Sequence, residues 1–261
     1  MMIKTNYHTH HYLCGHSVGK AEDYIIEAIK KGYKEIGISD HSPLPIEPPF
    51  PRMSYNDFIN IYLKDIDTTI EKYNSKIKIY KSLEVEYVYG HNEFYKDLLS
   101  KTDYLILALH YYSGYENMKS KSAYEVNSLD KLKEYCRLAI DAMNTGFFKI
   151  FAHPDIFMGG YPILDSSSEE CINELIQAAI KNDVYLEFNA GGVRKGKVKL
   201  VDNEYEYLFP NDQFWQLVSK TDVKVIVNSD CHSPQELEDE AMLEAKKLAN
   251  TKYKLNIINH I

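Results

Sequence analysis

The chain has 261 residues, a hydrophobic fraction of 44% and a formal net charge of −8, which is typical of a folded globular protein and excludes a disordered chain. The acidic balance disfavours a nucleic-acid partner, because long nucleic acids usually bind a basic face. Residues 1–10 lack the apolar segment of a signal peptide, and no stretch approaches the roughly 18 apolar residues of a membrane span. The four scattered cysteines form no C-x-x-C pair and are expected to be reduced thiols. We therefore expect a cytoplasmic protein with no membrane partner.

Short apolar runs alternate with longer amphipathic segments along the chain. Strands are predicted at 3–8, 35–39, 77–85, 104–109, 149–152, 184–188 and 224–228, and helices at 21–31, 55–73, 129–145, 168–181, 211–220 and 235–248. The compact apolar runs are typical of parallel strands that are buried on both faces. Residues 1–261 are therefore predicted to form a single α/β domain, a distorted TIM-like (β/α)7 barrel.

Two loops between these elements have an unusual composition. Segment 42–55 follows the second predicted strand and holds five of the nine prolines together with Arg52. Its prolines make it stiff. Segment 189–199 follows the sixth predicted strand and carries three glycines around Arg194.

Metal-binding types of side chain lie at or just after the carboxyl ends of the predicted strands. They are His8, His10, His16, His41, Glu84, His110, His153, Asp230 and His232. Residues two apart in an extended segment face the same way, so His8 and His10 can bind one ion together. The carboxyl ends of parallel strands meet on one face of a barrel, where such enzymes carry out their chemistry. Imidazoles mixed with carboxylates at that face predict a metal site.

A single histidine after a strand is more often an ordinary core or surface residue. We interpret His11, His91 and His260 in this way, because they do not share the strand-end position. Seven histidines at the same end of successive strands are much harder to explain as coincidence.

This ordered set resembles the polymerase-and-histidinol-phosphatase (PHP) superfamily. The matching motifs cover almost the whole chain and are His8-x-His10 followed by His16, Asp40-His41, Glu84, His110, His153 and Asp230-x-His232. The resemblance implies the PHP fold, a distorted seven-stranded barrel, with a trinuclear metal site. Within the superfamily, the segments 51–53, 82–86 and 189–195 look most like those of monofunctional histidinol-phosphatases. One departure is Ala190-Gly191, where relatives often carry a hydroxyl residue.

The resemblance also implies how the ligands are shared. One ion would be held by His8, His10, Glu84 and Asp230, a second by Glu84 as a bridge with His110 and His153, and a third by His16, His41 and His232. The expected cofactors are two or three divalent ions of zinc, iron or manganese, which such ligands accept alike. Two ions about 3.5–4 Å apart can lower the pKa of a water between them.

Arginine marks the expected phosphate side of the site. Arg52 and Arg194 lie in the two unusual loops, whereas the remaining arginine, Arg137, lies in a predicted helix. The planar fork of arginine donates two parallel hydrogen bonds to a phosphate, although a solvated loop charge is the simpler alternative. Candidates to protonate the leaving alkoxide are Asp155, Asp40 and a metal-bound water, and the sequence does not choose between them.

The predicted function is hydrolysis of a small phosphorylated substrate, L-histidinol phosphate, to L-histidinol and phosphate in histidine biosynthesis. Catalytic roles are expected for Glu84, Asp230, Arg194, Arg52 and Asp155. The alternatives are another PHP phosphoesterase, namely a nuclease acting on nucleic-acid ends or a phosphotyrosine-protein phosphatase, and a metal-binding domain without catalysis. The residues expected to contact the ammonium and imidazole groups are Glu86, Tyr87, Tyr89, Tyr111, Tyr112 and Phe50. The oligomeric state stays open.

Overall fold

The fold is described from a computed structural model for residues 3–47, 52–112, 121–162, 164–199 and 205–261. Within these ranges no helix combines the length and the apolar character needed to cross a membrane.

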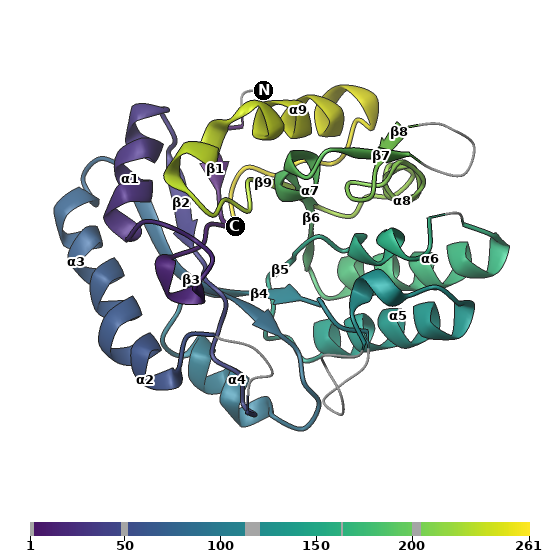
Figure 1. The fold of residues 1–261 in the computed structure, drawn as a ribbon, viewed down its shortest axis with the longest axis horizontal. Coiled ribbons are helices and arrows are strands. Elements are labelled where there is room, and N and C mark those ends of the chain that lie inside the picture. The colour runs from purple at the N-terminus through teal and green to yellow at the C-terminus, as the bar shows by residue number, and fades with distance from the viewer. Residues whose placement is uncertain (1–2, 48–51, 113–120, 163, 200–204) are drawn as a thin grey trace.

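Seven parallel strands form the centre of the molecule (Figure 1). Their order is β1 (Thr5–Asn6), β2 (Glu35–Ile38), β3 (Lys78–Glu86), β4 (Tyr104–Ala108), β5 (Ile150–Phe151), β6 (Tyr185–Asn189) and β9 (Val225–Asn228). Just beyond the first and last strands, Thr9 and Cys231 form a parallel bridge, and the amide of His10 donates to the carbonyl of Cys231 at 3.0 Å. The sheet is therefore nearly closed, which confirms the predicted distorted (β/α)7 barrel.

Helices surround this sheet. They are α1 (Ala21–Lys30), α2 (Tyr55–Asp57), α3 (Leu63–Tyr73), α4 (Asn92–Leu99), α5 (Leu129–Asn144), α6 (Ser166–Lys181), α7 (Ala190–Arg194), α8 (Asp212–Val218) and α9 (Glu240–Lys247). Shorter 3-10 turns lie at Tyr12–Cys14, Ala123–Glu125, Ile156–Gly159 and Pro234–Glu238, and π-helical turns lie at Phe58–Tyr62 and Leu248–Lys252. The first of the π-helical turns joins α2 to α3, so the helix predicted at 55–73 is present.

Two regions differ from the sequence-based prediction. Helix α4 was not predicted, and segment 189–199 is not a plain loop but α7 followed by β7 (Lys197–Lys199), which pairs with β8 (Tyr205–Tyr207). The side chain of Asn189 caps α7 by accepting from the amide of Gly192 at 3.2 Å. A Cβ atom on Gly192 would lie 2.0 Å from the carbonyl oxygen of Phe209. This glycine therefore permits close packing.

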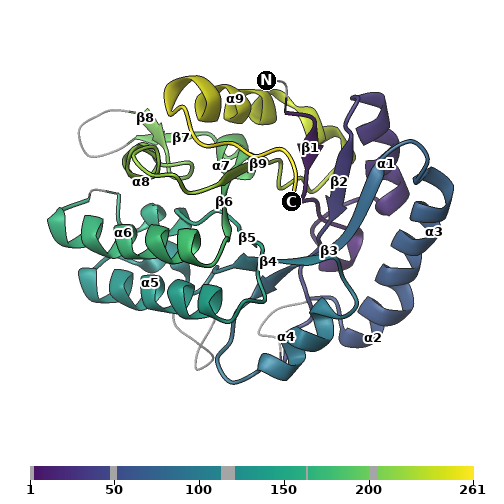
Figure 2. The same cartoon turned by 180° about the vertical axis from the view of Figure 1, so that it is seen from behind.

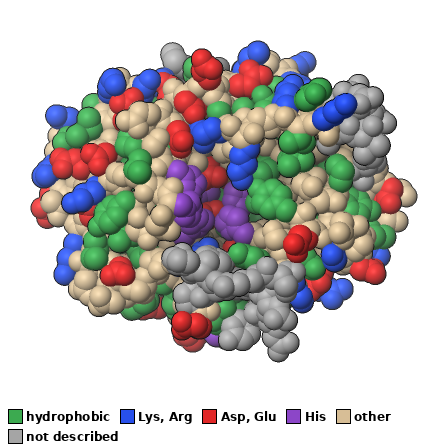
Figure 3. All heavy atoms as spheres, in the orientation of Figure 1, with side chains coloured by type: hydrophobic (Ala, Val, Ile, Leu, Met, Phe, Trp, Pro, Cys, Tyr) green, Lys and Arg blue, Asp and Glu red, His purple; other side chains and the backbone are tan. Residues whose placement is uncertain are grey.

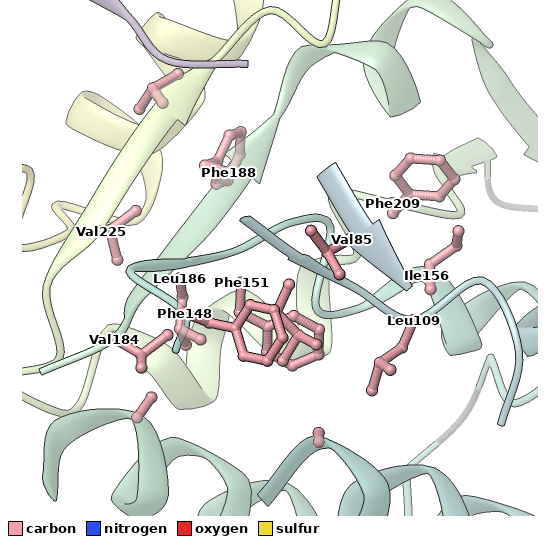
Figure 4. Close-up of a cluster of buried hydrophobic side chains, with 14 of the residues drawn as sticks. Val85, Leu109, Phe148, Phe151, Ile156, Val184, Leu186, Phe188, Phe209 and Val225 are labelled. Atoms are coloured by element: carbon pink, nitrogen blue, oxygen red, sulfur yellow. The ribbon is translucent and has the colours of Figure 1, made fainter. Parts of the chain in front are cut away.

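The alternation of side chains along β4 illustrates how the core is built. Leu105 and Leu107 belong to the outer core between the sheet and the helices, whereas Tyr104 and Ile106 belong to an inner cluster inside the barrel. In the outer core, the side chains of Val184, Phe148 and Phe151 lie between the sheet and the helices (Figure 4). Each such apolar side chain stabilises the fold by about 1.5–3 kcal/mol.

The C-terminal segment covers one end of the inner cluster. It runs beside β9 (Figure 2), where Val225 donates to the carbonyl of Asn256 at 3.0 Å and Ile258 donates back to Val225 at 2.9 Å. The side chains of Ile258 and Ile261 pack against the inner cluster. The amino ends of the strands are thus covered, and the opening of the barrel lies at their carboxyl ends.

Candidate metal centre

Histidine side chains gather in a central hollow of the surface (Figure 3). This hollow is a pocket of about 680 Å³, within the usual range for a small-molecule site. Eight of the nine predicted ligands line it: His10, His16, His41, Glu84, His110, His153, Asp230 and His232. The ninth, His8, is completely buried. The structure therefore brings the predicted ligand set together at the carboxyl ends of the strands.

The carboxylate of Glu84 lies at the centre of this cluster. Its Oε1 atom is 3.0 Å from Nε2 of His153 and 3.7 Å from Nε2 of His110. Its Oε2 atom is 2.7 Å from Nδ1 of His41 and 3.6 Å from Nε2 of His10. Glu84 reaches this position because it alternates along β3 with outward-facing core residues.

Three compact groups of ligand atoms resemble the predicted sharing of ions. They are His8 with His10 and Asp230, Glu84 with His110 and His153, and His10 with His41 and His232. Two groups differ from the prediction, because the first lacks Glu84 and in the last His10 takes the place expected for His16. The ring of His16 lies next to this group, with its centroid 4.9 Å from that of His232 and 5.2 Å from that of His41.

Buried polar atoms in this cluster fit a bound cation. Among the described residues, Nε2 of His8 is buried and makes no hydrogen bond, and the buried Nδ1 of His41 lies 2.7 Å from Oε2 of Glu84 in a geometry that does not suit a hydrogen bond. Leaving such atoms unsatisfied costs about 1–3 kcal/mol each, more when they are charged, and divalent cations accept such ligands. The residues present therefore fit the metal ions that the resemblance implies.

The electrostatics of the cluster also suit metal binding. Burial alone would raise the pKa of Glu84, but the imidazoles of His41, His8 and His110 outweigh it and hold that pKa well below its ordinary value. Burial, together with nearby His10, lowers the pKa of His232 to about 4. Glu84 is therefore ionised and His232 neutral near pH 7, as metal binding requires. Burial would lower the pKa values of His8 and His10, but nearby carboxylates outweigh it and raise them, so metal ions must displace protons from these two rings.

Two of the predicted ligands have an unusual backbone. His153 has φ of 31° and Asp230 has φ of 46°, a region that residues other than glycine seldom adopt. Each lies two residues after the last residue of a strand, His153 after β5 and Asp230 after β9. Strain of this kind gathers at functional sites, and here it turns both side chains into the pocket.

Three carboxylates contact the Nδ1 atoms of predicted ligand histidines, and the sequence analysis did not predict this arrangement. Glu187 lies 2.8 Å from Nδ1 of His8, Glu86 lies 2.9 Å from Nδ1 of His110, and Asp40 lies 3.3 Å from Nδ1 of His10. A carboxylate at one ring nitrogen fixes the tautomer and frees the other nitrogen for a metal. Glu86 was predicted instead to contact the substrate ammonium, and its burial and its bond to His110 contradict that prediction.

Arg194 lines the pocket, but its guanidinium is largely occupied. Nε and Nη2 contact the carboxylate of Asp239 at 2.7 and 3.2 Å, Nη1 donates to the carbonyl of Ser229, and Nη2 donates to that of Glu236. The fork therefore faces Asp239, and the predicted two-point grip on phosphate would require this ion pair to open. Within the described chain, Nη1 makes a single hydrogen bond, so one N–H remains for a ligand.

Two other cations line the same pocket. Arg52 donates from Nη1 to the carbonyl of Ser42 at 3.4 Å. Lys195 was not predicted as a site residue, and its Nζ atom donates to the hydroxyl of Tyr124 at 2.9 Å. Because lysine is abundant in this chain, nothing in the sequence indicated that this particular lysine lines the pocket.

The position of Asp155 does not support the predicted catalytic role. It is buried, and its Oδ2 atom accepts from the amide of Asn211 at 2.7 Å and from Nε1 of Trp215 at 2.9 Å. Burial raises its pKa to about 7. It is not among the described residues that line the pocket. We therefore assign Asp155 to the support of α8 and leave it out of the proposed catalytic set.

Of the aromatic residues expected to contact the substrate, some lie in the pocket and others lie elsewhere. Tyr111 lines the pocket. Tyr87 and Tyr112 are buried in the core, and the hydroxyl of Tyr89 donates to Asp141 at 2.7 Å. Phe50 lies outside the described residues. The aromatic rings that line the pocket with Tyr111 are Tyr124 and Phe209, which were not predicted.

Comparison with known proteins agrees with this geometry. The PHP domain family matches residues 6–191, well over half of the chain. The chain belongs to the PHP domain family. This membership accounts for a barrel whose strand ends carry histidines and carboxylates.

Three similar proteins carry names that refer to histidinol phosphatase activity. A Schizosaccharomyces pombe protein named probable histidinol-phosphatase is 23% identical, over 91% of this chain and 82% of its own. A candidate histidinol phosphatase from Listeria monocytogenes superposes with a TM-score of 0.72 at 20% identity, over 91% of this chain and 98% of its own. Histidinol phosphate phosphatase from Lactococcus lactis, solved with zinc, L-histidinol and phosphate, superposes with a TM-score of 0.70 at 17% identity, over 99% and 96%.

Proposed function

We propose that the protein is a metal-dependent phosphatase that hydrolyses L-histidinol phosphate to L-histidinol and phosphate. The observation that carries this proposal is the Glu84 carboxylate, which lies 2.7 Å from Nδ1 of His41 and 3.0 Å from Nε2 of His153 inside a ring of imidazoles. The names of the similar proteins support the choice of substrate. The Lactococcus lactis protein is named histidinol phosphate phosphatase, the Listeria monocytogenes protein is a candidate for that activity, and the Schizosaccharomyces pombe protein is named as a probable one.

The proposed ligands are the nine predicted residues. His8, His10 and Asp230 would hold one ion, Glu84 with His110 and His153 a second, and His41 and His232, with His10 or His16, a third. When bound, such divalent ions activate water and stabilise the charge of a phosphoryl group. Zinc, iron and manganese all suit this set.

The positive side chains of the pocket would orient the phosphoryl group. Arg52 and Lys195 line the pocket together with Arg194, whose remaining Nη1 N–H can donate to a phosphoryl oxygen. Arg194 would also hold the backbone at Ser229, next to the ligand Asp230. Arg194 would thus contribute one hydrogen bond to the phosphoryl group and would hold the loop at Ser229 in place.

The rest of the pocket suits the amino alcohol part of the substrate. Of the described carboxylates that line it, Glu236 is the one outside the proposed ligand set. One of its oxygens accepts from the amide of His232 at 2.8 Å, which fixes the side chain at the rim. A carboxylate pairs with a primary ammonium, and the rings of Tyr124 and Phe209 offer faces for an imidazole.

A substrate panel tests the proposal. The metal-loaded protein is assayed on L-histidinol phosphate, p-nitrophenyl phosphate, a phosphotyrosine peptide and DNA with phosphorylated 3′ or 5′ ends. We expect kcat/KM for L-histidinol phosphate to exceed the others at least about a hundredfold, the scale of a few kcal/mol of differential binding. Comparable efficiency on DNA ends or on the phosphopeptide would favour the alternative PHP activities. Glu84→Gln, purified in parallel, controls for contaminating phosphatases.

A further inference from the structure

Strand β6 carries a buried carboxylate that belongs to no proposed ligand group. Glu187 is completely buried. Its Oε1 atom accepts from Nδ2 of Asn228 at 2.9 Å and lies 2.8 Å from Nδ1 of His8. Its Oε2 atom accepts from the amide of His153 at 3.1 Å and from Nδ2 of Asn189 at 2.7 Å. Four contacts use the lone pairs of both oxygens, so Glu187 acts on its neighbours rather than as a ligand itself.

One of these contacts orients the imidazole of His8. A carboxylate at Nδ1 selects the tautomer that donates from Nδ1 and leaves a lone pair on Nε2. Nε2 of His8 lies 3.7 Å from Glu84 and 3.6 Å from Asp230, and it makes no hydrogen bond to any described residue. Glu187 therefore aims this nitrogen into the first ligand group.

A second contact holds His153, which belongs to another ligand group. The backbone of His153 has φ of 31°, a conformation that the surrounding structure must maintain. The bond from its amide to Glu187 fixes this turn, and Nε2 of His153 then lies 3.0 Å from Glu84. Asn189 extends the network, because its Nδ2 atom donates both to Glu187 and to Oδ2 of Asp230.

We propose that Glu187 is a positioning residue that links the ligand groups of His8 and His153, so that two metal ions depend on this one carboxylate. The proposal rests on the ligand set of the proposed function. Glu86 provides the contrast, because it lies 2.9 Å from Nδ1 of His110 and its other hydrogen bond to a described residue is from the amide of Tyr111, which is not a proposed ligand. Glu86 thus supports one ligand group where Glu187 supports two.

Metal affinities of two matched variants test this link. Wild type, Glu187→Gln and Glu86→Gln are stripped with a chelator and titrated with Co²⁺ or Zn²⁺ against a chromophoric competitor. Loss of a carboxylate behind a ligating histidine weakens metal binding about 10–100-fold. We expect Glu86→Gln to weaken one ion to this degree and Glu187→Gln to weaken two together. Wild-type affinities in Glu187→Gln, or a loss confined to one ion, would overturn the proposal.

Two controls show whether a change in metal affinity comes from misfolding or depends on the proposed activity. Circular dichroism of the stripped proteins shows whether each variant is folded. If Glu187→Gln does not fold, Glu187→Asp keeps the charge on a shorter side chain, and it should weaken the same two ions in parallel. Ion binding is measured without turnover. A wild-type protein that binds its ions but ignores L-histidinol phosphate therefore contradicts the proposed function and leaves the link intact, whereas a protein that binds fewer than two ions contradicts the link.

Discussion

The guanidinium of Arg194 and the carboxylate of Asp239 form a two-point ion pair, with Nε to Oδ2 at 2.7 Å and Nη2 to Oδ1 at 3.2 Å. The pair joins α7 to the start of α9, where Asp239 also caps the helix by accepting from the amide of Met242 at 2.9 Å. Burial would lower the pKa of Arg194, but the Asp239 carboxylate raises it, so the guanidinium stays charged. An arginine held in this way can present a fixed positive charge to the pocket.

The first prediction separates the structural and the phosphate-facing roles of Arg194. We expect Arg194→Ala to lower kcat/KM by about 2–4 kcal/mol of transition-state stabilisation, the scale of one lost donor. Asp239→Asn removes the ion pair but keeps the arginine and a good helix cap, so its loss should be less than about tenfold, roughly 1.4 kcal/mol. Steady-state kinetics on both variants give the comparison. Equal losses in the two variants would show that Arg194 acts through the loop alone.

The second prediction concerns metal content. Glu84 contacts imidazoles of all three ligand groups, for example His153 at 3.0 Å and His41 at 2.7 Å. Glu84→Gln should therefore lose at least two metal equivalents together with turnover, whereas wild type should retain two or three. Elemental analysis of freshly purified protein measures this, with the exposed Glu93→Gln on α4 as control. A fully active protein with one metal equivalent would contradict the trinuclear site.

The third prediction follows from the new role assigned to Asp155. Its Oδ2 atom accepts from the amide of Asn211 and from Nε1 of Trp215, both buried. Asp155→Ala leaves these donors without a partner, which should lower the free energy of unfolding by about 1–3 kcal/mol for each. Asp155→Asn keeps an accepting oxygen and should lose less. Metal content and kcat of the folded variants should stay near wild type, and a hundredfold fall in kcat at unchanged metal content would restore the catalytic role.

The sequence predicted the barrel and the convergence of the ligands because both depend on local patterns. Tyr104 to Ala108 reads as a buried strand from its apolar run, and the position of His110 just after it follows from chain order. Helix α4 was missed because its eight residues are fewer than the window of about 11–18 residues over which helical periodicity can be recognised. Segment 189–199 was interpreted as a loop from its glycines, whereas Gly192 is needed for close packing against Phe209.

Partners across the fold could not be predicted in the same way. Glu187 and His8 are 179 residues apart, and Arg194 and Asp239 are 45 residues apart. No local sequence pattern connects such pairs. The carboxylates that contact the ligand histidines, and the ion pair that engages Arg194, could therefore be identified only from the structure. The inward alternation of Glu187 and Asn189 along β6 was the one signal available.

The last prediction concerns how the pocket distinguishes its substrate. Glu236 lines the pocket, and its Oε2 atom is held by the amide of His232 at 2.8 Å. If its carboxylate binds the substrate ammonium, Glu236→Gln should raise KM for L-histidinol phosphate about 10-fold or more, near 1.4 kcal/mol. The same variant should leave KM for p-nitrophenyl phosphate, which has no ammonium, nearly unchanged.

A neighbouring acid provides the control for Glu236. Glu238 lies in the same 3-10 turn but forms ion pairs with Lys4 at 2.8 Å and with Lys246 at 3.0 Å. Glu238→Gln should therefore lower stability and leave both KM values unchanged. A parallel rise in KM for both substrates in Glu236→Gln would instead indicate that the substitution disturbs the His232 loop, because p-nitrophenyl phosphate shares the phosphoryl group with L-histidinol phosphate but not its ammonium. The ammonium contact would then have to lie elsewhere in the pocket.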